Sequence, residues 1–256
     1  MKHNIVTFIA LTTIVVSSVI FMETDFMWIV MGALLLIYLG ITAYGSYQIR
    51  ANYFLTSIHK GRKKAVSLTF DDGPDPEFTP RILAVLKEKK VKATFFVIGK
   101  KAEKYPELLR KIDEEGHTIA NHSYSHHVLI AFFSTARLTK DLARCNEVIH
   151  AAIGKTPMLF RPPFGVTNPR YPKAMRENGL ASIGWSLRSM DTQAKNKYQL
   201  IDNIISGLKG SDIILLHDRM EVTATSLEDI IEHIHSRRLG IEPLPAAINK
   251  EAYAKV

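Results

Sequence analysis

One short stretch decides the fold: Ser67-Leu68-Thr69-Phe70-Asp71-Asp72-Gly73-Pro74. A β-favouring run over 65–70 ends in two adjacent carboxylates and then in Gly-Pro, which stops a strand. The two aspartates are therefore expected at the carboxyl end of a strand, where α/β folds place their chemistry. Adjacent carboxylates repel one another unless a cation, a proton or an arginine compensates them. Taken alone, the stretch also fits a polar turn closed by Asp-Gly.

Short apolar strands alternate with amphipathic stretches from residue 65 onward. Expected strands are 65–70, 92–98, 117–121, 158–161, 181–186, 211–217 and a weak 241–244. Expected helices are 77–90, 102–115, 134–153, 170–178, 197–208 and 225–238. This α/β alternation predicts a parallel sheet that closes into a distorted, incomplete (β/α) barrel of about seven strands. An open doubly wound sheet is the competing architecture, but its G-x-G-x-x-G phosphate loop is missing.

The first fifty residues are predicted to form a two-helix transmembrane hairpin. Residues 4–22 and 26–48 carry no charge, and each stretch is long enough to cross a hydrocarbon layer of about 30 Å. A cleaved signal peptide is the alternative for the first stretch, but no small-x-small cleavage site follows it. The chain thus divides into a membrane anchor at 1–50, a basic juxtamembrane linker at 51–64 and an α/β domain at 65–256.

The net charge of +8 belongs entirely to residues 60–256, because the four charged residues before them cancel. No aromatic-basic interleaving or nucleic-acid motif accompanies this charge, which argues against nucleic acid and for membrane lipid or an anionic polymer as partner. A single cysteine, Cys145, excludes an intramolecular disulfide and a cysteine-rich zinc site.

Polar residues follow the ends of several expected strands. His122 and His126 follow the third strand, and their i, i+4 spacing lets two imidazoles face one metal ion. A carboxylate from Asp71 or Asp72 would complete a set of two histidines and one carboxylate. The carboxyl ends of parallel strands gather on one rim. Three further segments are therefore expected there: Arg161-Pro162-Pro163-Phe164-Gly165, Trp185 to Thr192, and Leu215-Leu216-His217-Asp218.

Four of these motifs, in this order, resemble the polysaccharide deacetylase family, the carbohydrate esterases with the NodB homology domain. The motifs are Thr69 to Pro74, His122-Ser123-x-x-His126, Arg161 to Gly165 and Leu215 to Asp218, and the resemblance covers about residues 63–245. It implies a distorted (β/α) barrel and a divalent metal ion, usually zinc, with cobalt or nickel as alternatives. The implied reaction is hydrolysis of the N-acetyl group of N-acetylglucosamine units in peptidoglycan or chitin-like polymers and oligomers.

The resemblance also implies a role for ten residues of this sequence. The implied metal ligands are Asp72, His122 and His126. The implied catalytic groups are Asp71 as general base, Arg161 holding Asp71, His217 as general acid and Asp191 steadying His217. The implied substrate-binding residues are Phe164 through its main-chain N–H, Leu215 around the acetyl methyl group, and Trp185. A water of lowered pKa, a carboxylate base and a histidinium acid together suit amide hydrolysis.

The sequence departs from the family pattern in one motif. Arg188 and Thr192 stand where the fourth family motif has an aspartate and a tryptophan, which affects the substrate groove more than the chemistry. His127, next to the histidine pair, is another residue of a metal-ligating type, but it is not expected to bind the metal ion. Two other functions stay open: a deacylase of a lipid-linked amino sugar at the membrane surface, and an inactive carbohydrate-binding module. A mere binding surface would not need the full set of ligands, base, arginine and acid.

The location predicted for the protein is the cytoplasmic membrane of a bacterium. Lys2 precedes the first apolar stretch, two acids lie between the stretches, and Arg50 and a basic cluster at 60–64 follow the second. The positive-inside rule then places the domain in the cytoplasm. Amino-sugar polymers lie outside the cell, so the substrate argument favours the opposite side.

Overall fold

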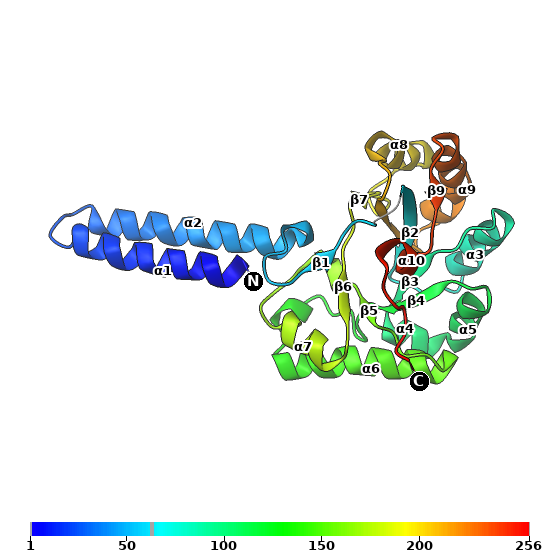
Figure 1. Cartoon of the computed structure of the whole chain (residues 1–256), viewed down its shortest axis with the longest axis horizontal. Helices are drawn as coiled ribbons and strands as arrows, with labels where there is room; N and C mark the ends of the chain where they lie inside the picture. The colour runs from blue at the N-terminus through cyan, green and yellow to red at the C-terminus, as the bar shows by residue number, and fades with distance from the viewer. Residues whose placement is uncertain (1, 62–63, 256) are drawn as a thin grey trace.

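The computed structural model describes residues 2–61 and 64–255, and its strands form a parallel sheet that curls into an open barrel (Figure 1). The strands are β1 Ser57–Ile58, β2 Ala65–Asp71, β3 Thr94–Val97, β4 Thr118–Asn121, β5 Leu159–Phe160, β6 Ala181–Ile183, β7 Leu187–Arg188, β8 Ile213–His217 and β9 Gly240–Ile241. Eight of them follow the order β1-β6-β5-β4-β3-β2-β8-β7, while β9 pairs with β2. Within the described residues, no pairing joins β1 to β7. The expected incomplete (β/α) barrel is confirmed.

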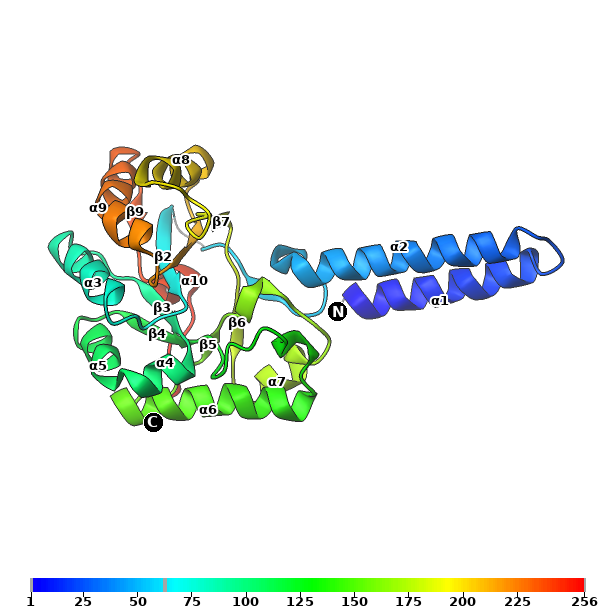
Figure 2. The same ribbon diagram turned by 180° about the vertical axis from the view of Figure 1, so that it is seen from behind.

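Helices cover the outer face of the sheet, as the views from both sides show (Figures 1 and 2). The α-helices of the domain are α3 Phe78–Glu88, α4 Gly99–Lys104, α5 Pro106–Glu114, α6 Thr135–Ile153, α7 Tyr171–Glu177, α8 Lys197–Gly207, α9 Glu221–Ser236 and α10 Leu244–Ile248. Short 3-10 helices are η1 Ile49–Ala51, η2 Ile130–Phe132 and η3 Pro163–Gly165.

Strand β2 is the centre of the sheet. All of its residues are buried, as expected for a strand covered on both faces. It pairs with β3 on one side and with β8 on the other. In this register Asp71 lies opposite His217 of β8. The pairing therefore brings an acid and a histidine to the same level of the rim.

Apolar side chains fill the space on both faces of the sheet. The larger cluster lies between the sheet and the outer helices and includes Phe70, Phe95 and Leu216. A second cluster holds residues of β3, β4, β5, β6 and β8 together with Leu244 and Ile248 of α10. Helix α10 therefore closes the interior at the amino-terminal ends of the strands, which leaves the carboxyl ends for a site.

Several expected boundaries were wrong, and two short strands were missed. The helix expected at 102–115 is two helices, because Pro106 disfavours a helical Tyr105, whose φ and ψ are −129° and 58°. The strand expected at 181–186 ends at residue 183, and the short strands β1 and β7 were not predicted. The helix expected at 225–238 begins at residue 221, and the strand expected at 241–244 covers only 240–241, because α10 follows.

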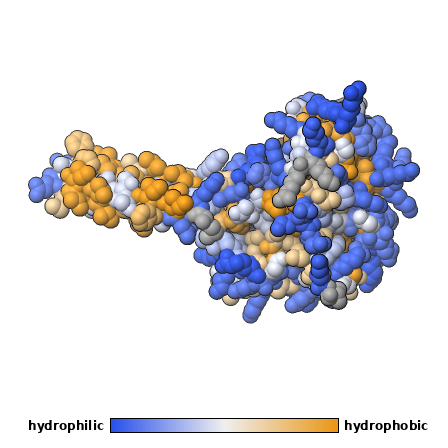
Figure 3. Space-filling view, viewed as in Figure 1, coloured by the Kyte–Doolittle hydropathy of each residue, from blue (hydrophilic) through white to orange (hydrophobic). Residues whose placement is uncertain are grey.

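The first two helices form an antiparallel hairpin that projects from the domain. They are α1 Lys2–Ile20 and α2 Met27–Tyr47, of 19 and 21 residues, with mean hydropathies of 1.8 and 2.0. The Thr7 and Tyr38 hydroxyls lie 3.1 Å apart across the pair. Figure 3 shows the hairpin as an apolar stalk beside a largely hydrophilic domain. Both helices are long and apolar enough to cross a membrane.

The hairpin is joined to the domain by a packed segment. The Ser46 hydroxyl donates to the Thr167 carbonyl at 2.6 Å, and the Thr167 N–H donates to the Ser46 carbonyl at 2.9 Å. The segment assigned as a linker, 51–64, contributes the buried Phe54 and strand β1, which pairs with β6. Arg62 and Lys63 of the basic cluster lie outside the described residues. The division at residues 50 and 64 stays a prediction.

Candidate active site

The carboxyl ends of six strands surround one pocket of about 330 Å³. Eight of the ten predicted site residues line it: Asp71, Asp72, His122, His126, Phe164, Trp185, Leu215 and His217. The remaining two, Arg161 and Asp191, lie behind the pocket wall with 0% and 1% of their surface exposed. The structure therefore brings together every residue that the sequence placed at the site.

Asp72, His122 and His126 form a compact cluster of potential metal ligands. Their ligand atoms all lie within 4.8 Å of one another. The Asp72 Oδ1 lies 3.2 Å from the His126 Nε2 and 3.5 Å from the His122 Nε2. One carboxylate and two imidazoles are a donor set that zinc takes, with positions left for water and substrate. The residues present fit a divalent ion.

The two histidines meet through a turn and not through a helix. Ser123 and His126 have φ values of 67° and 43°, and Asp72 has a φ of 75°. These left-handed conformations cost free energy in residues other than glycine and often mark functional sites. Hydrogen bonds hold the turn, because the Asn121 side chain accepts from the Ser123 N–H and the Ser123 hydroxyl accepts from the His126 N–H.

The protonation states of the cluster suit a metal ion. Burial, together with the charge of His122, lowers the pKa of His126 to about 4, so its imidazole is neutral at pH 7. Burial alone would raise the pKa of Asp72, but the hydrogen bond and charge of His122 and the charge of His126 hold it well below its usual value. The His122 Nδ1 lies 2.8 Å from the Arg161 carbonyl and therefore carries a proton, which leaves Nε2 toward Asp72. That nitrogen would be free to bind a divalent ion beside Asp72.

Asp71 lies beside this cluster and is held by a buried arginine. The Arg161 Nη1 donates to the Asp71 Oδ1 at 2.6 Å and to the Thr69 hydroxyl at 2.9 Å. The Arg161 Nη2 donates to the Gly184 carbonyl at 3.0 Å, and the guanidinium lies over the Phe96 ring at 4.1 Å. The second Asp71 oxygen, Oδ2, faces His122 at 3.8 Å. One carboxylate oxygen is thus fixed by the arginine while the other is directed to the metal-ligand cluster.

His217 lies at the end of β8, beside Asp71 in the strand pairing, and is oriented by Asp191. Its Nδ1 donates to the Asp191 Oδ1 at 2.7 Å, and its main-chain N–H donates to the Asp191 Oδ2 at 2.7 Å. The Thr223 hydroxyl also donates to that second oxygen, at 2.8 Å. Burial lowers the pKa of His217, but the hydrogen bond and charge of Asp191 outweigh burial and raise it overall. A histidine with a raised pKa holds its proton to a higher pH than a free imidazole does and can act as a general acid.

The Asp191→Asn change is expected to move the alkaline limb of the pH profile of kcat/KM to lower pH. A general acid must be protonated, so activity falls as the pH rises through the pKa of His217. Asparagine removes the charge that raises this pKa and leaves the burial that lowers it. The matched control is Thr223→Val, which removes one hydrogen bond to Asp191 but no charge and should shift the limb less. An unchanged limb in the Asp191 variant would contradict the assignment of His217 as the acid.

Sequence reasoning missed two residues of the pocket. Arg219 donates from Nε to the Asp72 Oδ2 at 2.8 Å, so it holds the oxygen that does not face the histidines. Its position two residues after His217, at a strand end, was an available signal. Tyr47, the last residue of α2, also lines the pocket. No local pattern could indicate that, because Tyr47 reaches the pocket only through the packing of the hairpin end.

The substrate side of the pocket combines aromatic and basic residues. Phe164 is half exposed, has a φ of 60°, and its ring centre lies 4.7 Å from that of His126. A Cβ on the next residue, Gly165, would lie 2.3 Å from the Trp185 ring, so glycine is required there. Arg188 and Thr192, the two departures from the family's fourth motif, both line the pocket. The unusual residues therefore lie where substrate would contact them.

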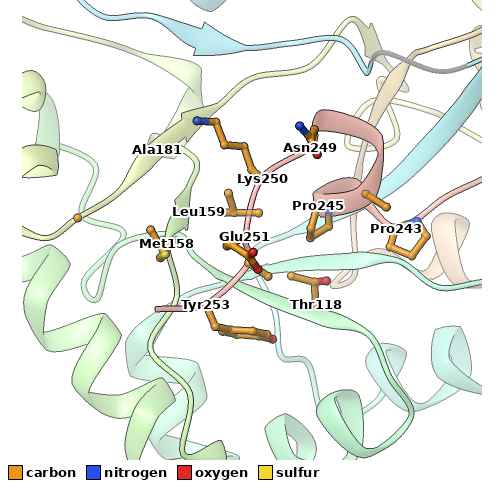
Figure 4. A pocket seen from close by; sticks show the side chains of 13 residues that line it. Thr118, Met158, Leu159, Ala181, Pro243, Pro245, Asn249, Lys250, Glu251 and Tyr253 are labelled. Carbon is orange, nitrogen blue, oxygen red and sulfur yellow. The ribbon is translucent and has the colours of Figure 1, made fainter. Parts of the chain in front are cut away.

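A larger cavity, of about 800 Å³, lies at the opposite ends of the strands (Figure 4). Thr118 begins β4 there, and the chain after α10 passes over the opening through Lys250 and Tyr253. The charged residues that line this cavity, among those the structure describes, are Lys250 and Glu251. It brings together no set of acids and histidines comparable to that of the rim.

The comparisons with known proteins agree on one protein family. Residues 59–183 match the polysaccharide deacetylase family. A peptidoglycan-N-acetylglucosamine deacetylase of Bacillus cereus is 33% identical over 188 residues, which cover 72% of this chain and 68% of that protein. A chitooligosaccharide deacetylase of Sinorhizobium fredii is 32% identical over 195 residues, which cover 71% of this chain and 90% of that protein.

The solved structure of the Bc1960 peptidoglycan N-acetylglucosamine deacetylase has the same fold. It superposes with a TM-score of 0.73 at 30% sequence identity, and the match covers 77% of this chain and 94% of that chain. The motifs on the rim and the sequence identity to these relatives together show that the chain belongs to the polysaccharide deacetylase family.

Proposed function

We propose that the protein hydrolyses the N-acetyl group of N-acetylglucosamine units in a metal-dependent reaction. The single observation that carries this proposal is the set of groups that share the pocket. The cluster of Asp72 and two histidines lines the same pocket as a carboxylate, Asp71, and a histidine, His217. A proton acceptor and a proton donor beside a metal site are what amide hydrolysis by water requires. The named activities of the relatives support the same chemistry.

Each residue has a defined task in this reaction. Asp71 accepts a proton from the attacking water, and Arg161 fixes the orientation of that carboxylate. His217 donates its proton to the nitrogen of the breaking C–N bond, so the products are acetate and a free amine. The main-chain N–H of Phe164 donates to the oxygen of the former carbonyl. When bound, the divalent ion supplies Lewis acidity, which polarises the acetamide carbonyl and acidifies a water.

We propose zinc as the ion. Neutral imidazole and carboxylate ligands in a set of three suit catalytic zinc, and cobalt or nickel would bind the same donors. Arg219 supports the site from outside, because it neutralises the Asp72 oxygen that faces away from the histidines. We propose it as a positioning residue for that ligand.

We propose that the hairpin of α1 and α2 anchors the enzyme in the bacterial cytoplasmic membrane. Lys2 and Arg50 lie at the end of the hairpin next to the domain, and Glu23 and Asp25 lie at the far end. The distribution of basic residues favours the cytoplasmic side for the domain. Mature glycan polymers lie on the other side, which makes the location of the domain informative about the substrate.

The second candidate substrate is a lipid-linked amino sugar. Tyr47 supports it, because the pocket wall includes the end of a helix long enough to span a membrane. Arg188 supports it as well, because it lines the pocket and has no acidic partner within the described part of the chain. An arginine in that position suits a phosphate that joins the sugar to its lipid.

The proposal is tested by acetate release from the purified full-length chain. The substrates are chitin oligomers, peptidoglycan and a polyprenyl-phosphate-linked N-acetylglucosamine, each with and without a chelator. We expect release from at least one substrate, its loss on chelation and its return with zinc. His122→Ala should abolish release, whereas His127→Ala, the exposed neighbour outside the ligand cluster, should retain it. Absence of release from every substrate with a metal-loaded protein would favour a carbohydrate-binding module.

A further inference from the structure

Three of the strongly exposed apolar side chains of the domain lie in one short segment. Outside the hairpin, the described part of the chain has five large apolar residues that are strongly exposed: Val128, Leu129, Phe132, Phe164 and Tyr198. The first three belong to the segment Val128–Phe132, which we call the apolar loop, and Phe164 lies on the pocket rim. Soluble surfaces seldom carry such a group without a partner.

The apolar loop is next to the end of the hairpin. The Asn168 side chain donates to the Ala131 carbonyl of the loop at 2.9 Å. The residue before it, Thr167, exchanges main-chain and side-chain hydrogen bonds with Ser46 near the end of α2. Both ribbon views place the loop beside α7, on the side of the domain from which the hairpin projects (Figures 1 and 2). The apolar loop and the end of α2 are therefore joined through Thr167 and Asn168, which follow the rim residue Phe164 in the chain.

The length of α2 sets the depth of this surface. Its 21 residues span about 31 Å at 1.5 Å per residue, close to the thickness of the hydrocarbon layer. The end of α2 then lies at the boundary between hydrocarbon and head groups, where Tyr44 and Tyr47 are typical residues. A neighbouring loop with three exposed apolar side chains would lie near the same layer.

Basic residues accompany the apolar loop. Arg137 lies over the Phe133 ring at 3.6 Å, and Arg170 lies two residues after Asn168, which contacts the loop. Both arginines are exposed. Apolar side chains flanked by arginine are typical of surfaces that lie in an anionic membrane interface.

We propose that Val128, Leu129 and Phe132 enter the lipid leaflet at the end of α2, so that the enzyme has a second membrane contact beside its anchor. The hairpin and the apolar loop then hold the mouth of the pocket on the lipid surface. A sugar carried by a lipid would reach the pocket in this position without leaving the membrane. This inference rests on the proposed membrane anchor and does not depend on the deacetylase activity.

The experiment measures depth in the membrane at single labelled positions. The full-length chain is placed in nanodiscs of phosphatidylglycerol and phosphatidylcholine, with an environment-sensitive fluorophore on Phe132→Cys and nitroxide-labelled lipids as quencher. The native Cys145 is fully buried, so it does not compete for the label. Leu36→Cys, in the middle of α2, is the positive control. Tyr198→Cys, which is as exposed as Phe132 but lies on α8 away from the hairpin, is the matched negative control.

We expect the label to be quenched at position 132, as at position 36, and not at position 198. Quenching at position 36 without quenching at position 132 would overturn the second membrane contact and leave the anchor intact. Absence of quenching at both positions would overturn the anchor and the contact together. Acetate release from chitin oligomers, measured on the same samples, reports separately on the proposed function.

Discussion

Replacing Asp71 by asparagine is expected to lower kcat by about 10²- to 10⁴-fold, the usual contribution of a general base. Asparagine keeps the shape of the side chain and can still accept from Arg161, but it cannot take a proton from water. The metal ligand next to it, Asp72, is unchanged, so zinc binding should persist. The measurement is the rate of acetate release at saturating substrate, with metal content determined on the same samples.

The matched control for this variant is Asp75→Asn in the same stretch. Asp75 accepts the main-chain N–H groups of Glu77 and Phe78 before α3, and asparagine can keep those bonds. This control changes the charge in the same way and should retain kcat within a few-fold. An Asp71→Asn enzyme as fast as the Asp75→Asn enzyme would show that Asp71 is not the base.

Replacing Arg161 by methionine is expected to lower the free energy of unfolding by about 3–5 kcal/mol, because the change leaves Asp71 as an unpaired buried charge. Arg161 is fully buried, and its guanidinium contacts Asp71, Thr69 and the Gly184 carbonyl. Methionine fills a similar volume, so the loss reflects charge and hydrogen bonds more than packing. Guanidinium unfolding of the solubilised full-length chain, followed by tryptophan fluorescence, measures the effect.

The double variant Arg161→Met with Asp71→Asn separates the buried charge from the packing. Because the second change removes the unpaired carboxylate, it should recover part of the stability that the first change removed. Activity should not recover, because the base is absent. A double variant no more stable than Arg161→Met would show that Asp71 is not destabilised by the loss of its arginine.

Much of the fold and the site could be predicted because the signals are local. The run that ends at Asp71 is a buried strand with a clear stop, and parallel strands bring their carboxyl ends to one rim. Once that rim was assumed, His122, Arg161 and His217 were expected near one another, since each ends a strand or directly follows one. Their gathering at one rim follows from topology more than from any single motif.

The parts that could not be predicted depend on long-range packing. Strands β1 and β7 have two residues each, too few to show an alternating pattern, and they are held by pairing with β6 and β8. The contact of Arg219 with Asp72 joins residues 147 positions apart. The approach of Tyr47 to the pocket needs the Ser46–Thr167 hydrogen bonds, which cross 121 positions. No window of sequence contains such information.

The hairpin end and the proposed catalytic groups are connected through a short chain of contacts. A Cβ on Gly184 would lie 3.3 Å from the Ile49 side chain, and the carbonyl of the same glycine accepts from Arg161. Arg161 in turn holds Asp71. Three contacts therefore connect the segment that follows α2 with the proposed base, which explains how the hairpin and the rim can form one unit.

The central claim is that Asp72, His122 and His126 hold one divalent ion between Asp71 and His217. Diffraction at the zinc absorption edge from crystals of the full chain grown with zinc tests it most directly. The account predicts a single anomalous peak about 2.0–2.2 Å from an Asp72 oxygen and from a ring nitrogen of each histidine. A peak located elsewhere, or bound by fewer than these three residues, would contradict it.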